Sequence, residues 1–181
     1  MSFSTILSLL PLLPLALSGV YAGTTYTISP SSHPDYCLAP ASATEGSDLV
    51  LKLCDSSSDI VFELDGDELR NTETNMCVDV RDGDEQSGTL LQMWSCYGHN
   101  SNQRFDVNGQ VAKWVGHDSC FDLKDGLGEA GNQIQIWSCY GHNTNQRWTF
   151  TEAEEYDGTD EVDCDENGMS LSIYPTRHRG G

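Results

Sequence analysis

The sequence predicts an all-β domain in which three repeats close around a threefold axis. Two stretches, "QMWSCYGHNSNQRF" at 92–105 and "QIWSCYGHNTNQRW" at 135–148, differ at only three of fourteen positions and lie 43 residues apart. Short apolar and polar alternations separated by Gly, Asp and Asn turns predict strands, and no long stretch has a helical period. A solenoid would need capping repeats, whereas three units of this length can close and leave no free sheet edge.

The first 22 residues are expected to be a secretory signal peptide that is not part of the fold. The apolar run at 6–20 is interrupted by two prolines, and the small Ala22 offers a cleavage site. This run is shorter than the roughly 20 apolar residues that a transmembrane helix needs. No later segment is apolar enough to enter a membrane, so we expect a secreted, extracellular protein.

The repeats are expected at 24–66, 67–109 and 110–152, within a domain of residues 23–152. The second and third copies correspond closely: "CVDVRDG" at 77–83 becomes "CFDLKDG" at 120–126. The first copy is degenerate, because it keeps two cysteines and an aromatic residue but little else. Fixed repetition of this kind indicates one structural unit used three times.

Cysteine spacing predicts one disulfide in each repeat. Cys77 and Cys96 are 19 residues apart, and Cys120 and Cys139 have the same separation. In a secreted chain this pattern favours disulfides, and the separation of 17 residues in the first repeat adds Cys37–Cys54. The seventh cysteine, Cys164, is left over; it is free, joins two chains, or pairs by reshuffling.

Strand alternation sorts the side chains of repeats 2 and 3. In "CVDV" and "LLQMWSC" the apolar residues at 78, 80, 91 and 93 face the core, and Asp79, Gln92 and Trp94 share the other face. If the two cysteines of a repeat are directly opposed, Asp79 lies opposite Trp94, and Arg81 opposite Gln92. By the same rule Asp122 lies opposite Trp137, and Lys124 opposite Gln135. The aromatic residues Phe62, Phe105 and Trp148 are expected to fill the core.

A carboxylate beside an exposed tryptophan suits a sugar. The apolar face of a pyranose packs on the ring, its hydroxyls donate to the carboxylate, and amides recognise other hydroxyls. The net charge of −19 disfavours nucleic acid and anionic membranes, and no Gly-rich loop leads into a phosphate-binding helix. We therefore expect no nucleic-acid partner and no cofactor.

The combination "CVDVRDG…LLQMWSCYGHNSNQRF" resembles the ricin B-type lectin family, whose repeats carry a Gln-x-Trp motif, here "QRF" at 103–105 and "QRW" at 146–148. The resemblance covers residues 24–152 and is greatest to small secreted fungal lectins with a single domain. It implies a β-trefoil of six hairpins with a shallow sugar pocket in each complete repeat. Repeat 1 has Ala39 and Lys52 at the key positions, so no sugar site is expected there.

The family's binding positions fall on an Asp, a Trp and an Asn-Gln pair in each of repeats 2 and 3, and the neighbouring loops add further candidates. The full set of candidate sugar-binding residues is Asp79, Gln92, Trp94, Tyr97, His99, Asn102, Gln103, Asp122, Gln135, Trp137, Tyr140, His142, Asn145 and Gln146. Asp79 is expected to be exposed, so Asp79→Asn should weaken sugar binding with little loss of stability.

Each candidate has a structural alternative. The tryptophans can be core residues and the aspartates turn residues, while Gln92 and Gln135 can orient the aspartates rather than touch the ligand. Gln103 and Gln146 can serve the fold or the ligand. The tyrosines can cover a hairpin edge. The two histidines lie in different repeats without a second ligand at zinc spacing, so they contact sugar at the rim or are merely solvated.

The tail, 153–181, is acidic and outside the family pattern, and is expected to be flexible. "DCDENG" at 163–168 matches the start of a calcium loop, but its twelfth position is Tyr174 rather than Glu, so no metal site is expected.

The favoured function is a lectin with two sites, in repeats 2 and 3, for galactose-type or xylan-type glycans. A glycoside hydrolase needs two carboxylates across one bond, which Asp79 and Asp122 in different repeats do not supply. We therefore expect no enzymatic activity. The main alternative is a protein-binding trefoil such as a secreted protease inhibitor.

Overall fold

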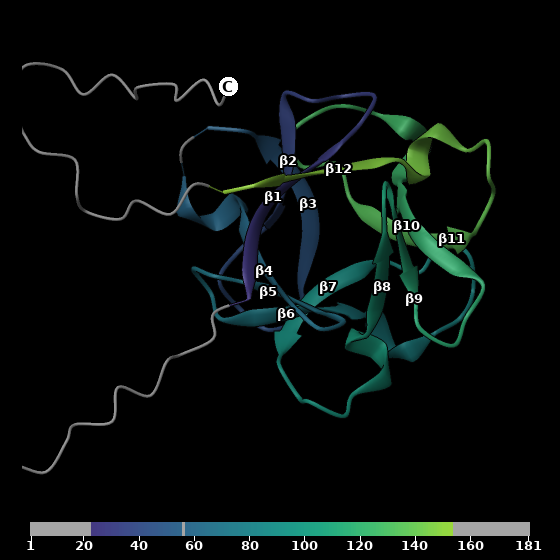
Figure 1. The fold of residues 1–181 in the computed structure, drawn as a ribbon, viewed down its shortest axis with the longest axis horizontal. Coiled ribbons are helices and arrows are strands. Elements are labelled where there is room, and N and C mark those ends of the chain that lie inside the picture. Colours follow the sequence, from purple (N-terminus) through teal and green to yellow (C-terminus); the bar gives the residue numbers. More distant parts are fainter. Residues whose placement is uncertain (1–22, 56, 154–181) are drawn as a thin grey trace, which may run out of the picture.

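The computed structural model describes residues 23–55 and 57–153, and within them the fold is all-β, as the sequence predicts (Figure 1). The signal peptide expected at 1–22, the tail beyond residue 153 and Cys164 lie outside the described residues. None of the helices in the described ranges is long and apolar enough to cross a membrane. The strands are β1 (Thr24–Pro30), β2 (Tyr36–Pro40), β3 (Ser47–Leu53), β4 (Val61–Asp65), β5 (Glu68–Asn71), β6 (Met76–Val80), β7 (Leu91–Ser95), β8 (Phe105–Asn108), β9 (Val111–Trp114), β10 (Ser119–Leu123), β11 (Ile134–Ser138) and β12 (Trp148–Glu152).

Short 3₁₀ helices follow the second and third strands of the repeats. They are η1 (Ser58–Ile60), η2 (Arg81–Gly83), η3 (Ser101–Gln103), η4 (Lys124–Gly126) and η5 (Thr144–Gln146). Each spans three residues, which is the usual length for a 3₁₀ segment, although Asp82 in η2 and Asp125 in η4 have positive φ. In repeats 2 and 3 these turns carry the polar residues of the candidate sites.

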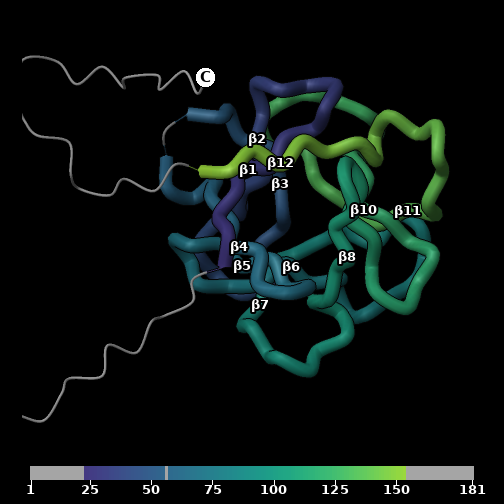
Figure 2. The backbone as a smooth tube through the Cα atoms, in the orientation of Figure 1, coloured from purple at the N-terminus to yellow at the C-terminus, as the bar shows by residue number. Residues whose placement is uncertain are grey.

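Each repeat contributes four antiparallel strands, and the hairpins β2–β3, β6–β7 and β10–β11 form within single repeats. Pairing between repeats joins β4 to β5, β8 to β9 and β12 to β1. The last pairing brings the first and last strands side by side, as Figure 2 shows for the purple and yellow-green segments. This cyclic arrangement of three four-stranded units is the β-trefoil that the resemblance implies.

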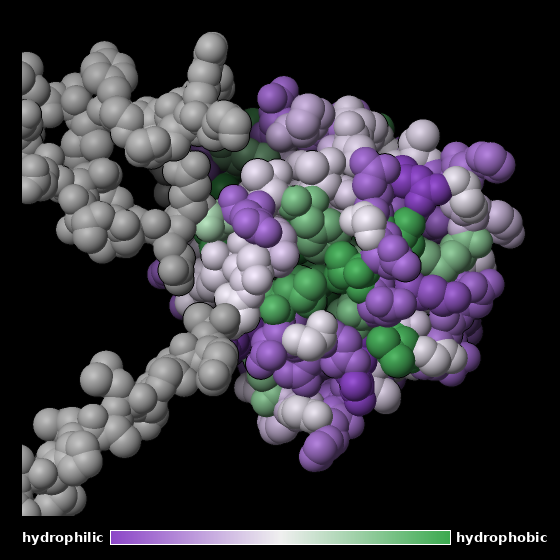
Figure 3. All heavy atoms as spheres, viewed as in Figure 1, coloured by the Kyte–Doolittle hydropathy of each residue, from purple (hydrophilic) through white to green (hydrophobic). Residues whose placement is uncertain are grey.

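The core is built from equivalent aromatic residues of the three repeats. Phe62, Phe105 and Trp148 are completely buried, as predicted. The ring of Phe121 makes edge contacts with both Phe105 and Trp148, at centroid distances of 4.8 and 6.4 Å. Figure 3 shows apolar side chains at the centre of the viewed face, with hydrophilic ones around them.

Three disulfides brace the hairpins, and they are the pairs that the spacing predicts: Cys37–Cys54, Cys77–Cys96 and Cys120–Cys139. In each, the first cysteine lies within a strand and the second directly follows the partner strand. A loop of this size adds about 3 kcal/mol of stability in the chain-entropy model. Each disulfide therefore fixes the end of a hairpin that carries a tryptophan or its substitute.

Candidate functional site

The pairing of β6 with β7 differs from the predicted register by two residues. Asp79 lies opposite Gln92, and Trp94 lies opposite Cys77, so the expected opposition of Asp79 and Trp94 is wrong. The reason is that Cys96 lies beyond the end of β7, so the disulfide does not join directly opposed residues. Trp94 is still on the same strand face as Gln92, because side chains alternate along a strand.

Repeat 3 has the same register, since Asp122 lies opposite Gln135 and Trp137 opposite Cys120. The expected pairs Asp122 with Trp137 and Lys124 with Gln135 are therefore also wrong. The apolar faces are as predicted in both repeats, with Val78, Val80, Leu91 and Met93 fully buried in repeat 2.

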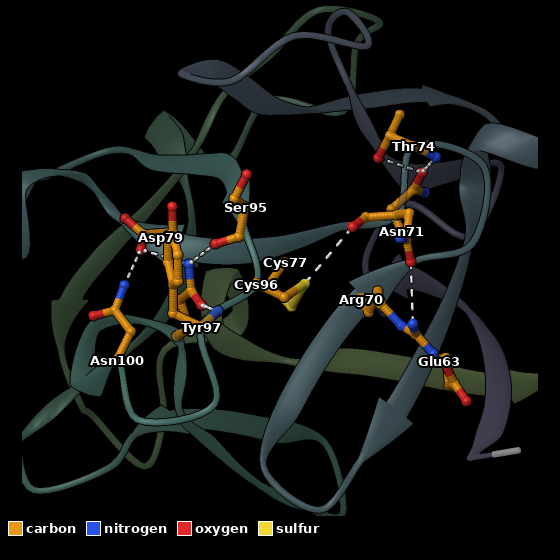
Figure 4. The surroundings of a disulfide bond; sticks show 12 residues. Glu63, Arg70, Asn71, Thr74, Cys77, Asp79, Ser95, Cys96, Tyr97 and Asn100 are labelled. Carbon is orange, nitrogen blue, oxygen red and sulfur yellow. Dashed lines mark hydrogen bonds and ion pairs between the residues drawn. A yellow bond between two sulfur atoms is a disulfide. The ribbon is translucent and has the colours of Figure 1, made fainter. Parts of the chain in front are cut away.

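Asp79 is the centre of a buried hydrogen-bond cluster. Its Oδ1 accepts from Gln92 Nε2 at 3.0 Å, and its Oδ2 accepts from Asn100 Nδ2 and Gln103 Nε2, both at 3.1 Å. Figure 4 shows Asn100 reaching the carboxylate close to the Cys77–Cys96 disulfide. Because a carboxylate can accept about four hydrogen bonds, one acceptor position on Oδ1 has no donor among the described residues.

The burial of Asp79 contradicts the expectation that this group is exposed. Only 3% of the residue is accessible, since three amide side chains cover it. Burial raises the pKa of the Asp79 carboxyl, the three amide hydrogen bonds oppose that rise, and the nearby Asp82 charge adds to it. The group is thus held as a hydrogen-bond acceptor at an energetic cost from desolvation.

The cluster recurs in repeat 3 around Asp122. Gln135 Nε2 donates to Oδ1 at 3.0 Å, while Asn143 Nδ2 and Gln146 Nε2 donate to Oδ2 at 2.9 and 3.2 Å. Above this cluster lies a cavity of about 200 Å³, which is open to solvent. It is lined by Asp122, Asp125, Gln135, Trp137, Asn143 and Asn145.

The tryptophans form the rim of the candidate sites rather than part of the core. Trp94 is 36% exposed and Trp137 is 40% exposed. Each ring lies against a glycine of the preceding repeat: a side chain at Gly46 or Gly88 would begin 3.6 Å from the Cζ3 atom of Trp94 or Trp137. One part of each ring is therefore supported by backbone, and the remainder is accessible to a ligand.

Gln103 and Gln146 each link the aspartate of their own cluster to the backbone. Gln103 is fully buried; it donates to Asp79 and to the Ser95 carbonyl, and accepts from the Tyr97 backbone N–H. Gln146 makes the equivalent bonds in repeat 3 and is also buried. Both glutamines therefore serve the fold, and their direct contact with sugar stays a prediction.

The other predicted residues are divided between the cavity and its surroundings. Asn145 lines the cavity of repeat 3, and Asn102 has the equivalent position in repeat 2. Tyr97 and Tyr140 are more than half exposed, and His99 and His142 are exposed on the same loops, outside the cavity lining. In the part of the chain that the structure describes, no group of three His, Cys, Asp or Glu side chains could hold a metal ion.

Two kinds of residue were missed, namely Asp82 and Asp125 in the first loop and Asn100 and Asn143 in the second. Asp125 and Asn143 line the cavity of repeat 3. Both aspartates have a φ of +56°, a left-handed conformation that Asp tolerates better than most residues. Their identity at an offset of 43 residues was the available signal, because both are unchanged between repeats 2 and 3.

Repeat 1 replaces the polar cluster with apolar side chains. Ala39 lies opposite Val50, where the other repeats pair Asp with Gln, and Ala39 packs against Ile60. Lys52 lies opposite Cys37, in the place of the tryptophan, and its Nζ is 2.5 Å from Asp59 Oδ2. Residues 39 and 52 led us to expect no sugar site in repeat 1. The structure shows that the polar cluster of the other repeats is replaced there as a whole.

Comparisons with known proteins agree with this fold. A family model described as a ricin-type beta-trefoil lectin domain matches residues 20–105 and 66–164. No curated protein sequence matches the chain.

Three similar solved structures show the fold. A mosquitocidal holotoxin has a TM-score of 0.66 and 15% identity over 75% of this chain, which spans only 18% of that protein. ThreeFoil, a designed threefold-symmetric protein, has a TM-score of 0.62 and 16% identity, with 71% of this chain and 99% of ThreeFoil covered. The C-terminal half of an earthworm R-type lectin, solved with GalNAc, has a TM-score of 0.62 and 15% identity, with 72% and 99% covered.

Proposed function

The chain belongs to the family of ricin-type β-trefoil lectin domains, and we propose that it binds galactose-type or xylan-type glycans at two sites. One site is the Asp79 cluster with Trp94, and the other is the Asp122 cluster with Trp137. Membership of this family supports carbohydrate binding in general; the number of sites and the glycan classes are our proposal. The GalNAc in the earthworm lectin structure makes galactose-type sugars the first class to test.

The observation that carries the proposal is the duplicated combination of a buried carboxylate, neighbouring amides and an exposed tryptophan. A pyranose packs its apolar C–H face on the accessible part of Trp137. One hydroxyl donates to the free acceptor position of Asp122, and the Asn143 and Asn145 side chains lie beside the same cavity. Trp94, Asp79 and their amides do the same in repeat 2.

Binding at these sites is non-catalytic. Asp79 and Asp122 belong to separate clusters in different repeats, and each is already held by three amide groups. Retaining and inverting glycosidases instead place two carboxylates on either side of one glycosidic bond. A small, open cavity favours weak binding of single sugars, with a dissociation constant of about 1 mM, or roughly −4 kcal/mol.

Titration calorimetry with galactose, GalNAc and xylo-oligosaccharides tests the proposal. We expect two sites on the wild type, one after Trp94→Ala, one after Trp137→Ala and none in the double variant. Lys52→Ala changes the equivalent residue of repeat 1 and is the matched control, with two sites retained. An unchanged stoichiometry after Trp94→Ala would contradict the assignment of the repeat 2 site.

A wild type that is folded but binds no glycan would instead favour the protein-binding alternative. Protease-inhibition assays would then be the next measurement.

We also propose that the protein is secreted. Three disulfides support an oxidising compartment, because such bonds are rare in the cytosol. Expression in a eukaryotic host followed by N-terminal sequencing of the medium fraction should give a chain that begins at Gly23. Retention of the full-length chain inside the cells would contradict this.

A further inference from the structure

His33 belongs to repeat 1, which lacks the polar cluster. It contacts the repeat 3 loop that carries Asp125. Its Nε2 lies 3.2 Å from the Gly126 carbonyl oxygen. Because a carbonyl oxygen only accepts, this hydrogen bond requires a hydrogen on Nε2. His33 is partly buried, so the contact is not a fully solvated one.

The same imidazole occupies the space where a side chain at residue 128 would lie. A Cβ atom on Gly128 would be only 2.2 Å from His33 Nδ1 and 2.3 Å from His33 Cγ. Gly128 is not among the residues with positive φ, so its backbone does not require glycine. A side chain at residue 128 would therefore clash with the His33 ring, so the packing favours glycine here.

The adjoining segment is also confined by Asn145, which lines the cavity. A Cβ atom on Gly126 would be 2.8 Å from Asn145 Oδ1. Asp125 and Gly126 have consecutive positive φ angles of +56° and +68°. A left-handed conformation is costly for a non-glycine residue such as Asp125. We therefore expect contacts with this segment to help fix the position of Asp125 in the cavity lining.

A histidine also contacts the repeat 2 loop, but through a side-chain carboxylate instead of a backbone carbonyl. His117, from repeat 3, has its Nδ1 3.4 Å from Glu85 Oε1, and Glu85 precedes Gly128 by the repeat offset of 43 residues. His33 and His117 have equivalent positions: their backbone N–H groups donate to the carbonyls of Pro30 and Trp114, three residues earlier, at 2.9 and 3.1 Å. Each of the two loops is thus contacted by a histidine from another repeat.

We propose that His33 is a positioning residue for the repeat 3 sugar site, acting through the Gly126 carbonyl and the Gly128 backbone on Asp125. The inference rests on the proposed function, since it assigns His33 to that same site. It makes repeat 1, which has no site of its own, necessary for full affinity at the site of repeat 3. It also makes Gly128 and His33 a coupled pair.

The test measures sugar affinity at the repeat 3 site alone, in a Trp94→Ala background. We expect His33→Ala and Gly128→Ala each to weaken binding about fivefold to tenfold, through a lost hydrogen bond and overpacking respectively. In the double variant His33→Ala/Gly128→Ala the ring is gone, so binding should be no weaker than with His33→Ala alone. Gly98→Ala is the matched control, because its Cβ would meet nothing within 4 Å.

Two further readouts separate positioning from general destabilisation. The repeat 2 site, measured in a Trp137→Ala background, should keep its affinity in all three variants. The backbone amide NMR shift of Asp125 should show the same coupling without any sugar, so it tests His33 even if no glycan binds the wild type.

Three results would overturn the proposal. They are unchanged affinity at the repeat 3 site after His33→Ala, additive effects of the two substitutions, and an equal loss at both sites.

Discussion

Asp79 is both a structural acceptor and a candidate ligand contact, and the two roles respond differently to substitution. All its hydrogen-bond partners in the cluster are amide donors, namely Gln92, Asn100 and Gln103. The amide of an asparagine at this position would direct its own N–H groups toward at least one of them. The sequence suggested a mild effect on stability; the buried cluster indicates the opposite.

We therefore expect Asp79→Asn to lower the free energy of unfolding by about 1–3 kcal/mol, because a buried donor is left without an acceptor. Urea denaturation followed by fluorescence measures this change. Asp65→Asn, at an exposed position of β4, is the matched control and should change stability little. Equal stabilities of the two variants would show that the amides rearrange around an asparagine.

The raised pKa of Asp79 predicts a pH dependence of binding at the repeat 2 site. Sugar hydroxyls donate to the ionised carboxylate, so affinity falls as the pH drops through the folded pKa of Asp79. Because burial raises that pKa, the loss should be centred above pH 3.8, the ordinary value for this group. Titration of the Trp137→Ala variant at a series of pH values checks this, and a midpoint below 3.8 would contradict it.

The contribution of Asp79 to folding has the opposite sign. A carboxyl whose pKa is raised on folding binds its proton more tightly in the native state. Its unfavourable contribution to stability is present above the folded pKa and disappears as the pH falls below the ordinary range. Affinity at the repeat 2 site and the Asp79 contribution to stability should thus change in opposite directions.

At the scale of elements, the loop that begins with η2 depends on the close approach of two backbone segments. Gly83 has a φ of +63°, and a Cβ atom there would be 2.9 Å from Asn102 Oδ1. The glycine therefore serves both the left-handed turn and the contact with the neighbouring η3 turn. These two effects can be separated, because Gly66 has the same φ and nothing within 4 Å.

We expect Gly83→Ala to lower stability more than Gly66→Ala, which carries only the cost of a left-handed alanine, about 1–2 kcal/mol. Gly83→Ala should also weaken the repeat 2 site, while Gly66→Ala leaves both sites intact. Thermal denaturation and titration calorimetry of the two variants measure these effects. Identical results for both would mean that Asn102 moves aside freely.

The all-β class and the strand faces could be predicted from the sequence, but strand register could not. Alternation placed Val78 and Met93 correctly, because the apolar side chains of each strand share one face and the polar ones share the other. Register failed because Cys96 follows the end of β7, and a sequence does not show where a ladder stops. Asn100 was missed for a related reason: its contact with Asp79 is made by a turn rather than a strand.

At the scale of the whole molecule, the repeats predicted a closed threefold all-β domain, and the family resemblance predicted the β-trefoil. Three units of about 43 residues leave few ways to bury one apolar face per unit. The absence of the polar cluster from repeat 1 was also predictable, because Ala39 and Lys52 stand where the other repeats have an acid and a tryptophan. That Val50 and Ile60 take the place of the polar cluster could not be predicted, since this required placing residues that are far apart in the sequence next to one another.

Two sites in different repeats should let one molecule bridge two glycan-bearing particles. Repeats 2 and 3 are related by a third of a turn, so their sites face different directions. We expect the wild type to aggregate beads coated with a ligand glycan, measured by light scattering. Trp94→Ala and Trp137→Ala should each bind single beads without aggregating them, whereas Lys52→Ala should behave as wild type. Aggregation by either single-site variant would indicate another site or self-association.

Because β1 pairs with β12, the three repeats form a closed ring. Their order along the chain therefore depends on the point at which the chain enters and leaves that ring. Five residue pairs join these strands, and Ala153 N–H donates to the Thr25 carbonyl at 2.9 Å. A short linker could therefore connect residues 153 and 23, and new termini could be introduced at a turn between repeats, such as 109–110, with every described contact preserved. In such circular permutants repeat 1 would be first, middle or last in the sequence, while its position in space relative to repeats 2 and 3 stayed the same.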